Sequence, residues 1–302
     1  MEPFGEIVIA ENNSGETLLH ILDGAVGLVL RGDGIGNSRI IEAGKGLKVI
    51  GRSGVGYDNV DIEAATARKI LVIITPGANA QAVAEAAITF MLTLCKKVVH
   101  WDTQLKKGNW MSRFGKSCGD LDGAVLGIIG LGNTGQKLAE LIRPFGMTVI
   151  AYDPFIAKES AEELDVKLVE IDELMKQSDF VSIHASLNEA SRGLINSERL
   201  NFLKPGSYLI NLARGGVIEN LDILYEALKN GRLAGVGLDV FEPEPPDVSH
   251  PIFKMQNCFT SPHALAMTRR SLHKSFKSMA TDIAAVLEGR KPRFVVNPEA
   301  LK

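Results

Sequence analysis

The sequence predicts an α/β fold in which parallel sheets carry helices on both faces. Three observations predict it. Short β-branched runs alternate with helical patterns along most of the chain, as is typical of parallel sheets. The 302 residues suffice for about two domains. Between Val125 and Asp153, a strand, a glycine turn, a helix and a second strand form one βαβ unit.

The glycine turn carries the most informative motif. Gly130, Gly132 and Gly135 stand in GxGxxG spacing between the strand and the helix. The first glycine makes a sharp turn, the second lets a pyrophosphate approach the backbone, and the third lets the helix pack closely. The N-terminus of the helix then receives the phosphates. Asp153 follows at about the distance expected of a ribose-binding carboxylate, and it favours NAD over NADP because it would repel a 2′-phosphate. The alternative is an ordinary turn whose glycines serve only packing.

Composition excludes several classes. A net charge of −3 and a pI near 6.1 argue against a nucleic-acid partner. Cys95, Cys118 and Cys258 match no metal or disulfide spacing, which indicates reduced thiols in the cytoplasm and no metal. The first ten residues lack the pattern of a secretion signal. The most apolar helical run, Ala82–Cys95, is too short to span a bilayer, so we expect no membrane partner.

Four short strand-like runs precede the βαβ unit of the glycine turn. They are Glu6–Ala10, Ala25–Leu30, Leu47–Ile50 and Leu71–Thr75, and the glycine-containing segment Lys106–Gly123 then leads to the second domain. Helical patterns lie between and after them at Ser14–Leu22, Asn37–Ala43, Asp61–Arg68 and Gln81–Val99. This alternation predicts a small α/β domain ahead of the glycine turn.

The same alternation continues from the glycine turn onward. Strands are expected at Thr148–Ala151, Phe180–His184, Ser207–Leu212, Gly235–Val240 and Cys258–Ser261, and helices at Gln136–Phe145, Leu221–Asn230 and Arg269–Leu287. The proline-rich run Phe241–Pro251 is expected to be a loop.

Several segments together resemble the D-2-hydroxyacid dehydrogenase family, which includes phosphoglycerate dehydrogenases and glyoxylate/hydroxypyruvate reductases. They occur in the family's order: GRSGVGYDNVD (51–61), TPGANAQAVAE (75–85), GLGNTG (130–135), NLARGG (211–216), GLDVFEPEP (237–245), SPH (261–263) and VVNPE (295–299). As a set they are highly specific and cover nearly the whole chain.

The resemblance implies two Rossmann-like, doubly wound parallel-sheet domains with a cleft between them. Residues 1–99 and 270–302 would form a discontinuous substrate domain, and residues 100–269 the NAD-binding domain. The substrate domain would be flavodoxin-like but lack the family's first βα unit, whose strand would lie between Glu6–Ala10 and Ala25–Leu30. Either the first strands close up, or the true start lies upstream, or the chain is a weakened variant. We favour an upstream start as a hypothesis.

Oxidation of a 2-hydroxy acid needs a base, and histidine suits that task near neutral pH. His263 follows a short strand, where α/β sheets present functional groups. His184 also ends a strand and could be a core residue. The family pattern pairs the histidine with Glu244, which would orient the imidazole, and Glu242 is the alternative acid. Arg214 matches the family's arginine, which grips the substrate carboxylate.

The resemblance also implies binding residues. The cofactor would be NAD, held by Val55, Gly130, Gly132, Asn133, Thr134, Gly135, Asp153, Ala185, Leu212, Ala213 and Asp239. The substrate would meet Arg31, Arg52, Ser53, Gly54, Arg214 and His263. Arg31 and Arg52 occupy positions where phosphoglycerate-oxidising members carry arginines, although both could be salt-bridged surface residues.

The predicted function is the interconversion of a D-2-hydroxy acid and its 2-oxo acid by hydride transfer with NAD. A phosphoglycerate dehydrogenase-like or hydroxypyruvate/glyoxylate reductase-like enzyme is favoured. The alternatives are an NAD(H)-sensing corepressor-type binding protein and an inactive, N-terminally shortened homologue. The helix Gln81–Val99 and the segment Lys106–Gly123 suggest a homodimer, largely by resemblance.

Overall fold

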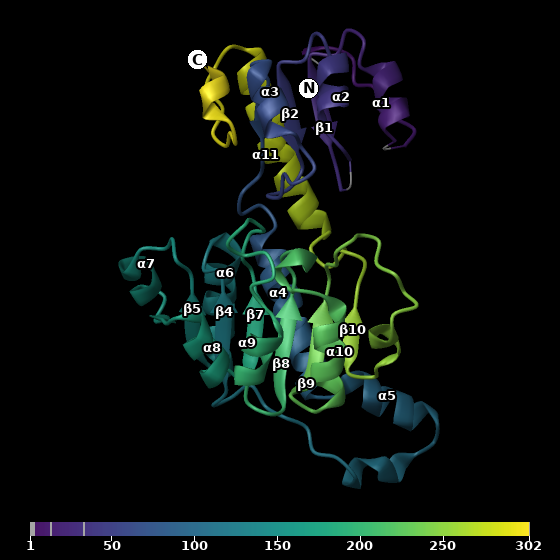
Figure 1. Ribbon diagram of the computed structural model, residues 1–302, viewed down its shortest axis with the longest axis vertical. Helices are drawn as coiled ribbons and strands as arrows, with labels where there is room; N and C mark the ends of the chain where they lie inside the picture. Colours follow the sequence, from purple (N-terminus) through teal and green to yellow (C-terminus); the bar gives the residue numbers. More distant parts are fainter. Residues whose placement is uncertain (1–3, 13, 33, 302) are drawn as a thin grey trace. The chain divides into compact units, whose positions relative to one another are not determined.

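A computed structural model describes residues 4–12, 14–32 and 34–301 and divides into two compact units (Figure 1). The first unit is discontinuous and comprises residues 1–79 and 267–302, and the second comprises residues 80–266. Residues 80–99, which the sequence analysis assigned to the substrate domain, fall in the second unit. Within the described ranges, no helix combines the length and the apolar character needed to cross a membrane.

The first unit is built on a three-stranded parallel sheet of order β1-β2-β3. Its strands are β1 (Gly27–Leu30), β2 (Val49–Arg52) and β3 (Leu71–Ile73), and its helices are α1 (Gly15–Ile21), α2 (Ser38–Ala43), α3 (Ile62–Ala67), α11 (Arg269–Leu287) and the 3₁₀ helix η6 (Pro298–Leu301). The helices begin where the sequence supplies caps: Ser14, Asn37, Asp61 and Thr268 each accept a hydrogen bond from a backbone amide of the first turn.

Alternate side chains of this sheet face two different cores. Ile50 and Val72 pack with α1, α2 and α3, whereas Val49 and Ile73 pack with Met279 of α11. Helix α11 lies close to β2, because a Cβ on Gly51 would approach Met279 Cγ to 2.9 Å. The last helix therefore belongs to the first unit although it follows the second unit in sequence.

The strand predicted at Glu6–Ala10 is wrong. These residues are irregular, and Ile7, Val8 and Ile9 are 60%, 60% and 87% exposed. Strand propensity expresses packing on a sheet and pairing with a neighbour, and an unpaired segment obtains neither. In the described residues the sheet of this unit begins with β1, and residues 6–10 do not join it.

The segment VVNPE is fixed by one buried amide side chain. Asn297 is fully buried; its Oδ1 accepts from the Val72 amide at 2.8 Å, and its Nδ2 donates to the Ile70 carbonyl at 2.9 Å and to Thr66 Oγ1 at 3.0 Å. Val295 adds an antiparallel bridge to Ile73. The C-terminal segment is thus attached to β3 and α3.

The second unit is a seven-stranded, all-parallel sheet of order β10-β9-β8-β7-β4-β5-β6. Its strands are β4 (Val125–Ile129), β5 (Thr148–Tyr152), β6 (Lys167–Leu168), β7 (Phe180–Ile183), β8 (Ser207–Asn211), β9 (Leu233–Leu238) and β10 (Cys258–Thr260). The chain runs outward from β4 in one direction to β6 and then restarts at β7 on the other side of β4. This is the dinucleotide-binding strand order, and its topological switch point lies between β4 and β7.

Helices cover both faces of this sheet, as predicted. They are α4 (Ala80–Cys95), α5 (Val98–Lys106), α6 (Asn133–Ile142), α7 (Lys158–Glu162), α8 (Ile171–Gln177), α9 (Ser197–Phe202) and α10 (Leu221–Lys229), with the 3₁₀ helices η2 (Trp110–Phe114), η3 (Arg143–Phe145), η4 (Gly215–Val217) and η5 (Pro251–Lys254). Helices α4 and α6 form one core with alternate strand residues, and α8, α9 and α10 form the other.

The single helix predicted over Gln81–Val99 is two helices. Helix α4 ends at Cys95, and Lys97 adopts a left-handed conformation with φ of 52° before α5 begins. A left-handed residue commonly ends a helix, although glycine usually occupies that position. The apolar pattern runs across the break, so periodicity alone predicts no interruption. Helix α5 and the residues after it extend away from the sheet (Figure 1).

Candidate functional site

The glycine turn joins β4 to α6, and each of its three glycines has different surroundings. Gly130 has φ of 92°, and a Cβ there would lie 2.6 Å from the Ala185 amide nitrogen, so only glycine fits both the turn and the neighbouring chain. A Cβ on Gly135 would overlap the Gly130 carbonyl oxygen. A Cβ on Gly132 would meet nothing within 4 Å. The turn therefore keeps free space only at the glycine expected to face a pyrophosphate.

The first turn of α6 and the end of β5 complete this region. Asn133 and Thr134 begin the helix, and no side chain caps its amides at Gly132. The Asp153 carboxylate follows β5 and accepts hydrogen bonds from the Leu131 amide at 2.8 Å and the Phe155 amide at 2.9 Å. Uncapped amides at a helix N-terminus suit a phosphate, and a fixed carboxylate one strand away suits a ribose. These residues fit NAD.

Arg214 follows β8 on a loop held by a buried side chain. Asn211 is fully buried; its Oδ1 accepts from the Ala213 amide at 3.0 Å, and its Nδ2 donates to the Arg214 carbonyl at 2.9 Å. The Arg214 guanidinium donates to the Ala213 carbonyl at 2.8 Å. Asn211 was recognised in the sequence only as part of a motif, and this role was not predicted. A polar residue at the end of an apolar strand could have indicated it.

Two further features place this loop. Leu212, a predicted cofactor residue, is buried at the end of β8. A Cβ on Gly215 would overlap the Phe241 carbonyl group, so the Arg214 loop packs backbone to backbone against the loop that leads to Glu244. Gly215 in NLARGG thus allows the two predicted functional loops to pack together.

Glu244 and His263 form the predicted couple. Glu244 Oε2 lies 3.0 Å from His263 Nδ1, and its Oε1 accepts from the Phe241 amide at 3.0 Å. Glu242, the alternative acid, is instead paired with Arg192 at 2.7 Å. Each carboxylate therefore has its own partner, and only Glu244 contacts the imidazole of His263.

The surroundings favour the ionised form of Glu244. Burial alone would raise the pKa of Glu244, but hydrogen bonds from His263 and from the Phe241 amide, with the positive charge of Arg214, outweigh it and hold that pKa below its usual value of 4.5. A carboxylate can only accept a hydrogen bond, so His263 Nδ1 carries the proton that it shares with Glu244. In the neutral ring Nε2 then has the lone pair.

Asp239, predicted to hold the nicotinamide, is buried at the end of β9 with 2% exposure. Its Oδ1 accepts hydrogen bonds from Ser261 Oγ and from the Ala264 amide at 3.0 Å, with a longer contact of 3.4 Å to the Leu265 amide. These residues flank His263. Sequence reasoning missed this use of Asp239 and the part played by Ser261.

His184, which the sequence left open as a possible core residue, is half-buried directly after β7. Its Nε2 lies 2.8 Å from Ser182 Oγ, while its buried Nδ1 has no hydrogen-bond partner among the described residues. Burial lowers the pKa of His184 to about 4. The ring is therefore neutral near pH 7, and it packs where β7 ends beside Gly130.

The predicted substrate arginines stand at the carboxyl edge of the first unit's sheet. Arg31 directly follows β1, and its guanidinium lies over the Phe276 ring at 5.1 Å. Arg52 ends β2 and donates to Asn59 Oδ1 at 3.1 Å and to the Gly32 carbonyl at 2.6 Å. Arg52 therefore also fixes the turn that follows Arg31.

The backbone after Arg52 forms a short loop at the same edge. The Ser53 amide donates to the Leu30 carbonyl at 3.1 Å, the Gly54 carbonyl accepts from the Thr75 amide at 2.8 Å, and Val55 is 39% exposed. All five predicted binding residues of the first unit thus lie at one edge. Arg214, Glu244, His263 and the glycine turn lie in the second unit.

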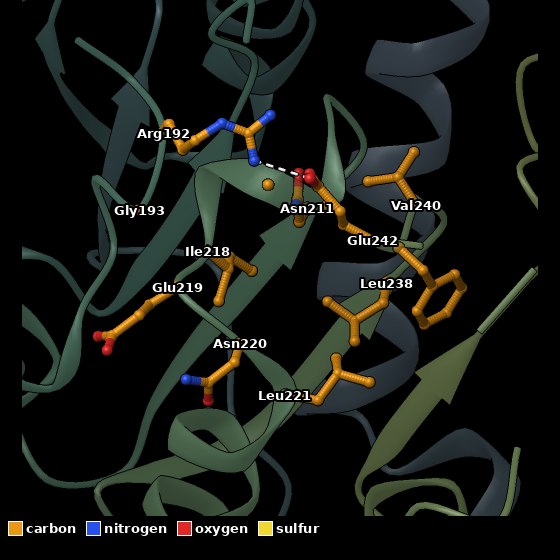
Figure 2. Close-up of a pocket in the computed structure, with 13 residues that line it drawn as sticks. Arg192, Gly193, Asn211, Ile218, Glu219, Asn220, Leu221, Leu238, Val240 and Glu242 are labelled. Carbon is orange, nitrogen blue, oxygen red and sulfur yellow. Dashed lines mark hydrogen bonds and ion pairs between the residues drawn. The ribbon is translucent and has the colours of Figure 1, made fainter. Parts of the chain in front are cut away.

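A cavity of about 360 Å³ is lined in part by residues of the Arg214 and Glu244 loops (Figure 2). Its lining comprises Arg192, Gly193, Asn211, Gly215, Gly216, Ile218, Glu219, Asn220, Leu221, Leu238, Val240, Phe241 and Glu242. None of the predicted site residues lines it. The ion pair between Arg192 and Glu242 lies at the cavity and joins the segment between β7 and α9 to the Glu244 loop (Figure 2). Within the described chain, no group of three or more His, Cys, Asp or Glu side chains is arranged to hold a metal ion.

The chain is similar to known proteins in sequence and in fold. Residues 88–264 match the sequence model of the D-isomer specific 2-hydroxyacid dehydrogenase NAD-binding domain. The chain belongs to this family. Its second unit, which contains the glycine turn, corresponds to the family's NAD-binding domain, and the prediction of NAD as the cofactor is confirmed.

Individual family members match most of the chain. It is 38% identical over 293 residues to a D-3-phosphoglycerate dehydrogenase of Archaeoglobus fulgidus, covering 97% of this chain and 55% of that protein. It is 40% identical over 263 residues to a hydroxypyruvate reductase of Thermotoga maritima, covering 86% and 84%. A crystal structure of a Thermus thermophilus protein superimposes with a TM-score of 0.85 at 33% identity, covering 97% and 91%. The chain spans about half the length of the phosphoglycerate dehydrogenases it matches.

Proposed function

We propose that this family member interconverts a D-2-hydroxy acid and its 2-oxo acid, with the second unit binding NAD and the first unit binding substrate. The observation that carries the proposal is the 3.0 Å contact between His263 Nδ1 and Glu244 Oε2, in the unit that carries the NAD-binding turn. An imidazole held by a carboxylate is a general base of the kind this oxidation needs.

His263 would remove the proton of the substrate hydroxyl through Nε2, because Nδ1 is already committed to Glu244. Glu244 would stabilise the imidazolium that forms, and its lowered pKa keeps it ionised for that purpose. The guanidinium of Arg214 would hold the substrate carboxylate by paired hydrogen bonds. When bound, NAD supplies the acceptor for the hydride that leaves the substrate carbon. In the reverse direction His263 would return the proton.

Binding of NAD would use the residues of the glycine turn. Gly132, Asn133 and Thr134 would present backbone amides to the pyrophosphate, and Asp153 would bind the adenosine ribose. Ala185 contacts Gly130 across the switch point, where a nicotinamide nucleotide passes in this fold.

For the substrate we propose 3-phosphoglycerate or hydroxypyruvate. The support is the pair of cations, Arg31 and Arg52, at one edge of the first unit's sheet, together with the named relatives, a D-3-phosphoglycerate dehydrogenase and a hydroxypyruvate reductase. A phosphate group would favour two cations, whereas hydroxypyruvate has no distal charge. Replacing Arg31 by glutamine should therefore raise KM for 3-phosphoglycerate much more than KM for hydroxypyruvate.

The test is NADH consumption with a panel of 2-oxo acids by the wild type and by His263→Gln. We expect turnover by the wild type and its loss in His263→Gln, with NADH still bound. His250→Gln is a matched control, because His250 Nε2 also contacts a carboxylate, Asp222, at 3.1 Å in the same unit. Unchanged turnover in His263→Gln would refute the assignment of the base. Binding of NADH without turnover of any acid by the wild type would favour a sensor of NAD(H).

We also propose that the chain is a homodimer whose contact includes α5 and the turn after it. Leu105, Trp110, Met111 and Phe114 are 59%, 59%, 65% and 72% exposed. So many large apolar side chains on one extended segment are typical of a surface that another protein covers. A second copy is the simplest occupant because it presents the same apolar segment.

Sedimentation or light scattering tests this assembly. The wild type should have twice the chain mass of 32.6 kDa, and Phe114→Glu should approach 32.6 kDa. Phe155→Glu is the control, since Phe155 is 84% exposed in the same unit but lies outside the extended segment. Equal masses for the wild type and Phe114→Glu would contradict the proposed contact.

A cytoplasmic location is proposed from the thiols. Cys95, Cys118 and Cys258 are all free, and burial raises the pKa of Cys258 to about 12, which makes that thiol unreactive. Free thiols persist in reducing compartments. Labelling of unfolded protein from fresh cell extract should find all three thiols reduced.

A further inference from the structure

One buried carboxylate oxygen holds both sides of the turn that carries His263. Asp239 Oδ1 accepts from the Ser261 hydroxyl before the histidine and from the Ala264 amide after it, the latter at 3.0 Å. Asp239 itself is 2% exposed. Its Oδ2 takes part in neither bond, so the clamp on the turn leaves that oxygen for other contacts.

The turn needs such a clamp because His263 has an unfavourable backbone conformation. Its φ is 53°, in the left-handed region that non-glycine residues seldom adopt and that persists only where the surroundings enforce it. The amide of His263 donates to the Ser261 carbonyl at 3.0 Å, and the Ser261 amide donates to the Leu238 carbonyl at the end of β9 at 2.9 Å. The strain is therefore concentrated between two points that are both attached to the sheet.

We propose that Ser261 and Asp239 are positioning residues, which force His263 into the left-handed conformation that places its imidazole against Glu244. Ser261 is the element specific to this task, since its hydroxyl contacts Asp239 and the backbone amides remain in any variant. The expected effect on catalysis rests on the proposed function. The placement of the imidazole ring against Glu244 does not rest on it.

Ser261→Ala removes the hydroxyl and leaves the rest of the turn. Releasing the turn should lower kcat about tenfold, because a left-handed non-glycine residue is disfavoured by about a factor of ten. The dissociation constant of NADH should stay within about twofold of wild type. Ser261→Thr restores a hydroxyl and should recover most of the loss. Ser207→Ala is the matched control: Ser207 is a buried serine of the same sheet, at the amino end of β8, and its loss should leave kcat unchanged.

A second readout does not depend on turnover. In ¹⁵N-histidine-labelled protein, the Nδ1 proton shared with Glu244 should give a downfield signal, identified by its absence in His263→Gln. We expect that signal in wild type, Ser261→Thr and Ser207→Ala, and its loss or broadening in Ser261→Ala. Wild-type signal and wild-type kcat in Ser261→Ala would overturn the proposal. If no acid is turned over, the proposed function fails, and the NMR signal still decides whether Ser261 positions the ring.

Discussion

Replacing Gly132 by alanine should abolish cofactor binding without harming the fold. Gly132 has φ of −76° and ψ of −161°, which any residue adopts, and a Cβ there would meet nothing within 4 Å. Alanine also reduces the conformational entropy of the unfolded chain. We therefore expect the free energy of unfolding to be unchanged or raised by up to about 1 kcal/mol.

Binding of NADH should respond in the opposite way. The space beside Gly132 is the approach to the amides at the start of α6, and a methyl group there would occupy the proposed position of the pyrophosphate. Overpacking of this kind costs about 1–3 kcal/mol. The dissociation constant of NADH should therefore rise by about 5- to 150-fold.

Gly130→Ala is the contrasting variant. Its φ of 92° would disfavour alanine by about 1–3 kcal/mol. The added Cβ would lie 2.6 Å from the Ala185 amide nitrogen and 2.8 Å from the His184 carbonyl carbon, and backbone atoms cannot rotate away. This overlap adds about 1–3 kcal/mol, for a total loss of about 2–6 kcal/mol in the free energy of unfolding.

Urea denaturation and NADH fluorescence titration distinguish these effects. Unfolding of the second unit can be followed by intrinsic fluorescence, since both tryptophans, Trp101 and Trp110, lie in it. Either of two results for Gly132→Ala would refute the reasoning: wild-type affinity for NADH, or a loss of stability as large as that of Gly130→Ala.

Three further predictions follow from the described contacts. Glu244→Gln removes a carboxylate whose pKa is lowered in the folded state. The wild type should therefore have a larger unfolding free energy than the variant above about pH 5.5, and this difference should shrink as the pH falls below 4.5. Urea titrations from about pH 4 to 7 measure it. Asn297→Ala should destabilise the first unit by about 2–5 kcal/mol in circular dichroism melts, because the Val72 amide and the Ile70 carbonyl lose their buried partner. Asp153→Ser should raise the ratio of kcat/KM for NADPH over NADH by at least about tenfold, and an unchanged ratio would exclude contact with the ribose.

The sequence alone was sufficient to predict those elements that depend on residues close together in the chain. The GxGxxG turn and the alternation of strands with helices each follow from neighbouring residues, and each is present. The strand order of the second unit follows from the position of the glycine turn in a doubly wound fold. The contact between Glu244 and His263 was expected only through the family resemblance, because the two residues are 19 positions apart with a strand between them.

Features that depend on residues far away in the sequence were not predicted. Glu6–Ala10 has strand propensity but pairs with no strand among the described residues, so it is irregular and largely exposed. The break at Lys97 needs a left-handed residue where no glycine marks it. The hydrogen bonds of Arg52 to Asn59 and Gly32 were also not predicted, because hydrophobic periodicity does not specify where the turn at Gly32 lies.

The two loops that carry Arg214 and His263 are built on one structural principle. Asn211 ends β8 and Asp239 follows β9; the two strands are neighbours, and the Asp239 amide donates to the Asn211 carbonyl at 3.1 Å. Each of these buried side chains then bonds the backbone or side chains of its own loop, Asn211 at residues 213 and 214 and Asp239 at residues 261 and 264. Most polar side chains in the interior make hydrogen bonds, and these two make theirs with their own loops. The ends of β8 and β9 therefore hold the loops that carry the guanidinium and the imidazole.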